Sequence, residues 1–473
     1  MHRGLNAIAY NRRTHVPHRI DPRGWLVPRT AFLAVLFIYL IVVRTRGVAD
    51  TFALRGDQMR DWTWALAPLR ELRMTGTPSH VGGTTLGPVY YWTLWTIRHL
   101  IGPWTDNLPH AGGIGLSIVQ AAADVLLLVA IWKKTASWWL ALAVVLFVAT
   151  APFDMAISAA MWNPALSEAL VKTAIAFVLL AGDHPSAWRV AGITAAAWLA
   201  VQAHSIAIFV AAPILVSLVV SEIAGRHWRT AFDRLRLIVE VIVILQIPFF
   251  VDLLRHPPDI VAPTAVVNSL AYTLGHPASV RLGQTIDAVC GAFAYVLIRP
   301  WSLAPFKWLL LIVTAAAAMR VRRDLMLASV TVLPLAAFVV GFSLTQLPFD
   351  SYYALPLGPS LGLTVGLALT LWQPAARPLA VAATVALLLA QPGRYGEART
   401  GLPVPFYGAL VKGSREIRRW APDIRSIETD FALPESTDPA FIYQVLGGRL
   451  LPDSRFTARI GLDGGVTFTA TAP

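Results

Sequence analysis

Apolar segments of the length that crosses a lipid bilayer recur along this chain as far as about residue 392. The chain is 56% hydrophobic and only 14% charged, so water-soluble cores could not bury its apolar side chains. The sequence therefore predicts an all-α polytopic membrane protein with about eleven transmembrane helices. The predicted spans are 26–45, 111–131, 137–153, 165–182, 187–203, 205–223, 236–253, 304–320, 325–345, 355–373 and 377–392.

Basic residues set the predicted orientation of these spans. The arginines that precede or open the first span place the N-terminus in the cytoplasm; they are Arg3, Arg12, Arg13, Arg19, Arg23 and Arg29. Two further apolar stretches, 84–101 and 286–303, are ambiguous. If both are interfacial or re-entrant elements on the outer side, the later basic clusters also fall in the cytoplasm. We adopt that topology, which leaves the C-terminal tail outside the cell.

Charge and cysteine content narrow the classes of protein further. The net charge is +12, but the arginines cluster beside apolar segments, so topology explains the excess better than a nucleic-acid partner does. Cys290 is the only cysteine, which leaves no internal disulfide and no thiolate metal site. The first apolar run, 31–43, is followed by arginines and not by small residues, which predicts an uncleaved signal anchor.

The last part of the chain has a different character. Residues 393–473 are polar and charged, and they contain no further span. The segment RFTARIGLDGGVTFTAT alternates apolar and polar residues around Asp-Gly-Gly, which predicts a β-hairpin, and AFIYQVLGG is typical of a short helix closed by glycine. The sequence thus predicts a transmembrane domain at 1–392, whose first outer loop is 46–110, and a small α/β appendage at 393–473.

The first outer loop carries a dense group of charges in RGDQMRDWTWALAPLRELRMTG. In a helix from about residue 57, one face would carry Asp57, Arg60, Asp61 and Trp64. Two carboxylates beside a guanidinium could hold a divalent cation, accept a proton from a hydroxyl, or orient a sugar that stacks on Trp62 or Trp64. The same pattern also fits an amphipathic helix that lies on the membrane surface.

The stretch that follows, GTPSHVGGTTLGPVYYWTLW, favours a functional site. Its glycines and small polar residues predict a loop, and LGPVYYW predicts an aromatic helix with Pro88 near its first turn. An acidic motif, an arginine, a loop and a proline-led aromatic helix therefore stand in order between two predicted spans.

This region resembles the first outer loop of the GT-C membrane glycosyltransferases. The resemblance is to the branch that contains the protein O-mannosyltransferases and the bacterial transferase that puts aminoarabinose on lipid A. Members carry an Asp-x-x-Arg pattern, a helix that ends in glycine, and a Pro-Leu-x-Tyr-Trp-like stretch; here these are DQMR, LRELRMTG and GPVYYW. The resemblance covers 55–95 and extends more loosely to SAAMWNP and FDSYYALPLGP. Many members have a double proline where this chain has Gly87-Pro88.

The resemblance implies a GT-C-type bundle with outer interfacial helices, in which a sugar moves from a polyprenyl-phosphate donor. The family's loop aspartate is proposed to activate the acceptor, and it matches Asp57 here. Arg60 and Asp61 are then the expected catalytic helpers, and Tyr90 and Tyr91 are expected to contact substrate.

Asp154, Asn163 and His204 are further candidates for substrate binding, at the outer ends of predicted spans. GT-C enzymes often place a second acid, used for metal or substrate, in the loop that matches Asp154. As alternatives, Asp154 could be an acid near a helix N-terminus, Asn163 a helix cap and His204 a packed structural histidine. Asp124 and Glu240 lie within predicted spans without an obvious partner in the sequence, and such acids are candidate functional residues.

Arg281, Arg299, Tyr352 and Tyr353 are candidate contacts for the donor phosphate, because guanidinium and phenol groups hydrogen-bond phosphate oxygens. Asp350 precedes the two tyrosines in the stretch that resembles a late loop of the family. Anchoring at lipid headgroups is the alternative for both arginines.

Together these features predict a mannosyltransferase-like enzyme that moves a hexose or pentose from polyprenyl phosphate to a glycan, lipid or protein acceptor at the outer face, with inversion. The sequence contains no phosphate-loop pattern for a cytosolic nucleotide-sugar, which agrees with a lipid-linked donor. No cofactor is certain from the sequence, although a divalent metal ion is compatible with it. The predicted location is a bacterial-type inner membrane. A lipid-linked sugar flippase or transporter is the alternative, and it would need a polar path through the spans.

Overall fold

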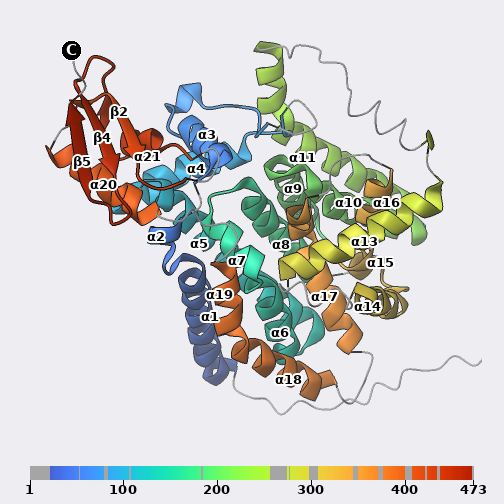
Figure 1. Ribbon diagram of the computed structural model, residues 1–473. Coiled ribbons are helices and arrows are strands. Elements are labelled where there is room, and N and C mark those ends of the chain that lie inside the picture. Colours follow the sequence, from blue (N-terminus) through green and yellow to red (C-terminus); the bar gives the residue numbers. More distant parts are fainter. Residues whose placement is uncertain are drawn as a thin grey trace, which may run out of the picture.

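The computed structural model describes residues 22–52, 54–78, 84–105, 108–182, 185–255, 274–275, 277–297, 307–344, 350–370, 376–399, 407–420, 423–433 and 437–470. It shows a bundle of helices, a group of short helices at one end of the bundle, and a small appendage that contains the strands (Figure 1). The predicted all-α architecture with an α/β appendage is confirmed.

Apolar helices form the bundle. They are α1 (Pro22–Thr45), α5 (Leu108–Thr135), α6 (Trp138–Ala149), α8 (Asn163–Ala181), α9 (Ala187–Ala203), α10 (Ile208–Ala224), α11 (Trp228–Arg255), α13 (Ala278–Leu297), α14 (Lys307–Val321), α16 (Val332–Ser343), α17 (Gly358–Leu369) and α18 (Ala376–Leu389). Leu, Val, Ile, Ala and Phe side chains fill their centre in one continuous cluster. Large apolar side chains on α1, α11 and α14 are exposed, as expected of surfaces that contact lipid.

The number of spans depends on how bent helices are counted. Among the described residues, six helical segments are long and apolar enough to cross a membrane, or eight if each bent pair is one span. The bent pairs are α6 with α7 (Pro152–Ala159) and α18 with α19 (Gln391–Ala398), which turn by 59° and 51°. The predicted span 137–153 is therefore too long, because Pro152 begins a new helix. The predicted eleven spans also include shorter apolar helices, such as α14 and α16.

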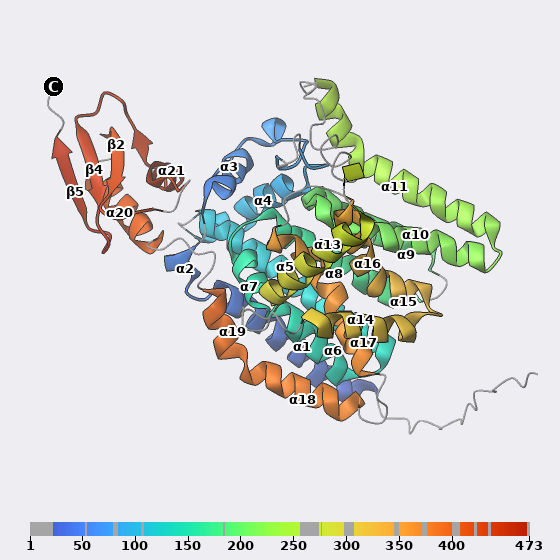
Figure 2. The ribbon, with the colours of Figure 1, turned by 45° about the vertical axis from the view of Figure 1, so that its right-hand side comes forward.

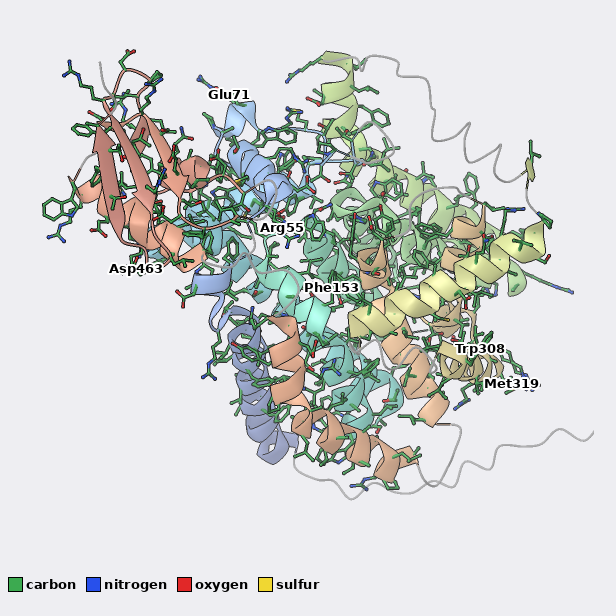
Figure 3. The ribbon with its side chains drawn as sticks, in the orientation of Figure 1. Arg55, Glu71, Phe153, Trp308, Met319 and Asp463 are labelled. Carbon is green, nitrogen blue, oxygen red and sulfur yellow. The ribbon has the colours of Figure 1, made fainter. Side chains whose placement is uncertain are left out.

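Short helices connect the bundle. They are α2 (Val48–Thr51), α3 (Gly56–Ala65), η1 (Leu69–Glu71), α4 (Val89–Leu100), η2 (Gly102–Trp104), η3 (Ser205–Ala207), α15 (Leu325–Ser329) and η5 (Ser351–Leu357). Of the two ambiguous stretches, 84–101 contains only α4, whose 12 residues are too few to cross a bilayer. The other stretch begins within α13, and its last part, 298–303, lies outside the described residues. Figure 3 shows Glu71 at the α3 end of the molecule and Trp308 and Met319 on α14 at the opposite side.

The appendage is an α/β unit in which the predicted hairpin is present. Its elements are α20 (Tyr407–Trp420), β1 (Asp423–Ile424), β2 (Ser426–Thr429), α21 (Pro439–Val445), β3 (Arg449–Leu450), β4 (Phe456–Ile460) and β5 (Val466–Ala470). β4 and β5 pair antiparallel, and the turn between them places Gly464 at φ 76°, which glycine adopts without strain. β2 pairs parallel with β4, so the strand order is β2-β4-β5. The proposed domain boundary at residue 393 falls within α19.

Figures 1 and 2 both show the appendage on the side of the molecule that carries α2 and α3. α2 and α20 are in contact, and the buried side chains of the appendage belong to the same hydrophobic cluster as those of α3 and α4. The charged helix predicted in the first loop therefore packs against α4 and shares a hydrophobic cluster with the appendage.

Candidate active site

The charged face of α3 forms one connected ion-pair network. Arg60 Nη1 lies 2.8 Å from Asp57 Oδ1, and Arg60 Nη2 lies 2.9 Å from Asp61 Oδ1. Arg60 Nε donates to the same Asp61 oxygen at 3.0 Å. The Asp57 side chain is 45% exposed, whereas that of Asp61 is fully buried. The predicted shared face is thus present, and Asp61 fixes a guanidinium that in turn holds the accessible Asp57 carboxylate.

Burial gives Asp61 unusual acid–base properties. It raises the pKa of Asp61 to about 6, and the pairing with Arg60 and the hydrogen bond from Tyr91 oppose this only in part. The Tyr91 hydroxyl donates to Asp61 Oδ1 at 3.1 Å, while Asp61 Oδ2 has no hydrogen-bond partner among the described residues. Asp61 therefore binds a proton more tightly in the folded protein than in the unfolded chain.

A pH series on the Asp61→Asn variant tests this environment. Because the pKa of Asp61 is raised from 3.8 to about 6, the folded wild type is stabilised by the bound proton below pH ~4. That stabilisation is lost as the pH rises through about 6, and it is worth up to about 3 kcal/mol, since each pKa unit corresponds to about 1.4 kcal/mol. The melting temperature of Asp61→Asn minus that of the wild type should rise between pH ~4 and ~6 and then level off. A difference that is constant with pH would contradict the assigned environment.

Tyr90 and Tyr91 lie behind the ion pairs, on the buried face of α4. Tyr91 holds Asp61, and the Tyr90 hydroxyl donates to the Met161 carbonyl at 2.8 Å. Both side chains are 0% exposed, and burial raises the pKa of both phenols. The expected direct contact with substrate is therefore not what the structure shows. The two hydroxyls instead connect α4 to α3 and to the turn that precedes α8.

The tryptophans of α3 also differ in accessibility. Trp62 is 0% exposed, so its ring is not available to stack on a sugar as the sequence left open. Trp64 is half-buried: the Arg73 guanidinium lies 3.6 Å from the centre of its ring, and the Tyr91 ring meets it edge-on at 5.1 Å. Trp64 thus covers the buried side of the ion-pair network.

A second group of side chains, the aromatic corner, lies within electrostatic range of Asp57. It consists of Trp162, His204, Tyr352 and Tyr353, whose rings are packed together at centroid distances from 4.6 to 5.9 Å. The Asp57 carboxylate adds to the raised pKa of the Tyr352 phenol, after burial, Tyr353 and Asp350, so Asp57 and Tyr352 lie within electrostatic range of each other. Three of the predicted substrate contacts, His204, Tyr352 and Tyr353, are thus brought together in one corner.

Asn163 ties the same corner to the loop between α3 and α4. Its amide nitrogen donates to the Ala203 carbonyl at 2.8 Å and to Thr77 Oγ1 at 3.3 Å. It does not cap α8, because Trp162 occupies the N-cap position without a side-chain hydrogen bond. Asn163 is 6% exposed and positions two segments of the site.

The predicted phosphate contacts are dispersed. Arg281 is 8% exposed and donates to the Ser343 carbonyl at 2.6 Å, one residue from Phe342, whose ring packs against Tyr353. Asp350 is exposed immediately before η5. Arg299 lies outside the described residues.

Asp154 belongs to a separate, fully buried group of charges. Arg44 Nη2 lies 2.8 Å from Asp154 Oδ2 and 2.7 Å from Asp124 Oδ2. Lys172 Nζ lies 2.9 Å from Asp124, 3.2 Å from Glu168 and 3.5 Å from Asp154. These residues, the buried ion cluster, join α1, α5, α7 and α8. The prediction that Asp154 contacts substrate is not supported by this placement, since the side chain is buried, Oδ2 faces two cations and Oδ1 accepts from the Ser158 hydroxyl at 3.1 Å.

Sequence reasoning missed most of this cluster. From the sequence, Arg44 only supports an uncleaved signal anchor, Lys172 is not distinctive, and Asp124 has no obvious partner. A signal was available, because Glu168 and Lys172 are four residues apart inside an apolar segment, where an unpaired lysine is costly. The other partners come from three helices distant in sequence. Glu240, the other acid within a predicted span, forms an exposed pair with Arg236 at 3.2 Å.

An apolar groove runs beside the site. It has a volume of about 540 Å³ and lies between α4, α5, α9 and α11; we call it the α4–α11 groove. The lining includes Trp92, Leu100, Ile118 and Leu245, and Gln202 provides an amide at the α9 wall. Gln202 is two residues before His204, so this wall leads toward the aromatic corner.

Gly87, where many resembling proteins have proline, leaves space for Gln202. A Cβ atom on residue 87 would lie 2.4 Å from Gln202 Cδ. The Gln202 amide cannot move freely, because it is buried and donates to the Leu245 carbonyl at 2.8 Å and to Gln246 Oε1 at 2.7 Å. The departure from the family pattern thus has a local steric cause.

We expect Gly87→Ala to destabilise the protein by about 1–3 kcal/mol through overpacking against Gln202. Gly283→Ala is the matched control, because residue 283 is in α13 and an added Cβ meets nothing within 4 Å. That substitution should be neutral or stabilise α13 by about 0.5–1 kcal/mol. Thermal melting of both purified variants measures the difference, and equal melting temperatures would show that the Gln202 contact is unimportant.

The described residues do not form a ready metal site. No group of three or more His, Cys, Asp or Glu side chains is placed to share an ion within the described part of the chain. Arg60 already occupies the position between Asp57 and Asp61. The donor set therefore does not fit a divalent cation held by these two acids, and no step below passes through one.

The bundle, the charged helix α3 and the appendage together have a fold similar to that of the solved structure of ArnT. ArnT from Cupriavidus metallidurans, solved bound to undecaprenyl phosphate, is 16% identical with a TM-score of 0.53, covering 89% of this chain and 85% of its own. ArnT from the same organism in the apo state is 13% identical with a TM-score of 0.53, and the match covers 90% of this chain and 85% of that one. The oligosaccharyltransferase of Archaeoglobus fulgidus, in a complex with Zn and sulfate, is 10% identical with a TM-score of 0.49, and the match covers 91% of this chain and 67% of that one. No protein-family model and no curated protein matches the sequence.

Proposed function

We propose that this chain transfers a sugar from a polyprenyl-phosphate donor to an acceptor at the outer face of the membrane. The observation that carries the proposal is the exposed Asp57 carboxylate, which the buried Asp61 and Arg60 hold in place within a GT-C-type fold. A fixed and accessible carboxylate is suited to accept a proton from the acceptor during transfer.

In the proposed reaction, Asp57 accepts the proton of a hydroxyl or amine as that group attacks the anomeric carbon of the donor sugar. The bond from this carbon to the phosphate oxygen breaks on the opposite side, so the configuration inverts. The electron pair leaves with the polyprenyl phosphate. Arg60 lies beside Asp57 and is 32% exposed, so it can stabilise negative charge in the site as the bond breaks.

The aromatic corner is the proposed binding surface for the sugar. His204, Tyr352 and Tyr353 pack their rings together within electrostatic range of Asp57, and aromatic faces bind the apolar faces of sugars. Asp350 directly precedes η5, which carries Tyr352 and Tyr353, and Arg281 reaches this region only through the Ser343 carbonyl; both are kept as candidates for the phosphate and sugar hydroxyls. Tyr90, Tyr91 and Asn163 position these groups from behind.

The α4–α11 groove supports a lipid-linked donor. It is apolar, and one of its walls is α9, which ends at Ala203 next to His204 of the aromatic corner. ArnT, which shares the fold, was solved with undecaprenyl phosphate bound, and that lipid belongs to the proposed donor class. A water-soluble nucleotide-sugar would gain little from such a groove.

The donor class is tested by incubating the purified protein with a panel of undecaprenyl-phosphate-linked sugars and a panel of nucleotide-sugars, each with cell-envelope lipids and glycans as acceptors. We expect free undecaprenyl phosphate and a glycosylated acceptor from at least one lipid-linked sugar, and no transfer from nucleotide-sugars. Transfer from a nucleotide-sugar alone would overturn the proposal.

The proposed location of the site is the outer face of a bacterial-type inner membrane, with the N-terminus in the cytoplasm. Cys290 is buried, so single cysteines can report the side on which a residue lies. In whole cells, a membrane-impermeant maleimide should label Glu71→Cys, whose side chain is 56% exposed near the site. It should not label Arg322→Cys, in the exposed turn after α14, until the membrane is opened. The reverse pattern would invert the topology.

A further inference from the structure

The segment that connects α1 to α3 lies between the bundle and the appendage. Phe52 and Leu54 are both 0% exposed. The Phe52 ring lies 5.3 Å from the ring of Tyr407, the first residue of α20, and 5.6 Å from the ring of His110 in α5. Thr437, before α21, donates to the Leu54 carbonyl at 3.4 Å. The appendage thus contacts the chain on both sides of residue 53.

The appendage and the site helices are packed as one hydrophobic unit. Trp62 of α3 and Tyr91 of α4 belong to the same cluster as Tyr407, Leu410 and Tyr443 of the appendage. The same cluster includes Leu116 of α5 and Leu166 of α8, whereas most of the bundle's core forms another cluster. A change in the position of the appendage can therefore reach α3 through one continuous set of buried side chains.

The two parts approach each other closely at Gly408. A Cβ atom on residue 408 would lie 2.6 Å from Asp50 Oδ1 and 3.1 Å from the Asp50 Cα atom. The Asp50 carboxylate can rotate away, but the backbone Cα atom cannot, so an added methyl group would push α20 and α2 apart by a few tenths of an ångström.

We propose that the appendage is a positioning element for the catalytic carboxylate, acting through the contact of α20 and Thr437 with the 50–54 segment. Leu54 is three residues before Asp57, and α3 begins between them at Gly56. The position of the helix start therefore fixes where the Asp57 carboxylate lies relative to the aromatic corner. A displacement of about 1 Å at a reacting group can lower the rate of catalysis by about 100-fold. This inference rests on the proposed function for its catalytic consequence, but not for its structural one.

A matched pair of glycine substitutions in α20 separates positioning from general damage to the appendage. Gly408→Ala inserts a methyl group against Asp50, and Gly413→Ala inserts one against the Ile460 side chain, 2.6 Å away and entirely inside the appendage. Both overpack the same helix. Only the first moves the appendage against the 50–54 segment.

We expect hydrogen exchange in peptides that cover 52–66 to become faster in Gly408→Ala and to remain at the wild-type rate in Gly413→Ala.

The maximal transfer rate should fall about 10-fold or more in Gly408→Ala while KM for the lipid-linked donor changes little, because the groove is not altered. Asp50→Ala removes the nearest atom, so the double variant with Gly408→Ala should recover part of the rate and of the protection. Equal effects of the two glycine variants on exchange at 52–66 would overturn the inference. Exchange is measured without substrate, so a failure of the proposed function leaves this outcome readable.

Discussion

Asp57→Asn should abolish sugar transfer while leaving the fold and the donor affinity intact. Asparagine has nearly the same shape but cannot accept a proton from the acceptor, and a positioned general base contributes roughly 10²- to 10⁴-fold to the rate. The Asp57 side chain is 45% exposed and pairs only with the half-exposed Arg60, so its loss should change stability by less than about 1 kcal/mol. The measurement is single-turnover transfer, with undecaprenyl phosphate binding followed by native mass spectrometry.

Glu71→Gln provides the control for this variant. Glu71 is an acid of the same loop, and its side chain is 56% exposed in a pair with Arg70 at 3.1 Å, outside the ion-pair network of α3. We expect it to transfer sugar at the wild-type rate. If Asp57→Asn kept the wild-type rate as well, Asp57 could not be the base, and Asp61 would be the next carboxylate to consider, since it is joined to the same guanidinium.

The largest effect on stability is expected at Lys172. Its ammonium group lies within 3.5 Å of three buried carboxylates, those of Asp124, Asp154 and Glu168, and it donates to Gln120 Oε1 at 2.8 Å. Lys172→Met leaves these acids with fewer cations in a site without water access. Breaking a buried ion pair by removing one partner typically costs about 3–5 kcal/mol. Thermal unfolding in detergent should therefore show a large fall in melting temperature.

Two further variants decide whether charge balance is the cause. Lys134→Met removes a lysine whose pair with Asp324 is 3.7 Å long and partly exposed, so it should cost less than about 1 kcal/mol. Glu168→Leu combined with Lys172→Met removes one acid with the base and leaves Asp124 and Asp154 on Arg44. The double variant should be more stable than Lys172→Met alone, because apolar side chains of similar volume often replace a buried ion pair well. A double variant as unstable as the single one would mean that packing, and not charge, explains the effect.

The sequence predicted the local parts of the site well, because they depend on neighbouring residues. Helical spacing alone places Asp57, Arg60 and Asp61 on one face, and Pro88 sets the start of α4. Alternation around a glycine turn was enough for the hairpin of β4 and β5.

The parts that the sequence could not predict depend on contacts between distant segments. Spacing shows that Asp57 and Asp61 share a face, but not that one is exposed and the other buried beneath Tyr91. Asp154 was expected in the site, because position relative to a span does not reveal that Arg44 and Lys172 reach it from other helices. Nothing local in Tyr407 or Gly408 indicates that the appendage contacts the segment before α3.

The most direct test of the central claim is the fate of the lipid-linked sugar in proteoliposomes that contain the purified protein. Undecaprenyl-phosphate-linked sugars, labelled in the sugar, are placed in both leaflets with an acceptor on one side. The account predicts that the bond between sugar and phosphate is broken, so that label appears on the acceptor and undecaprenyl phosphate accumulates, and that Asp57→Asn prevents both. Intact lipid-linked sugar that moves between the leaflets without cleavage, equally in the wild type and in Asp57→Asn, would contradict the account and identify a flippase.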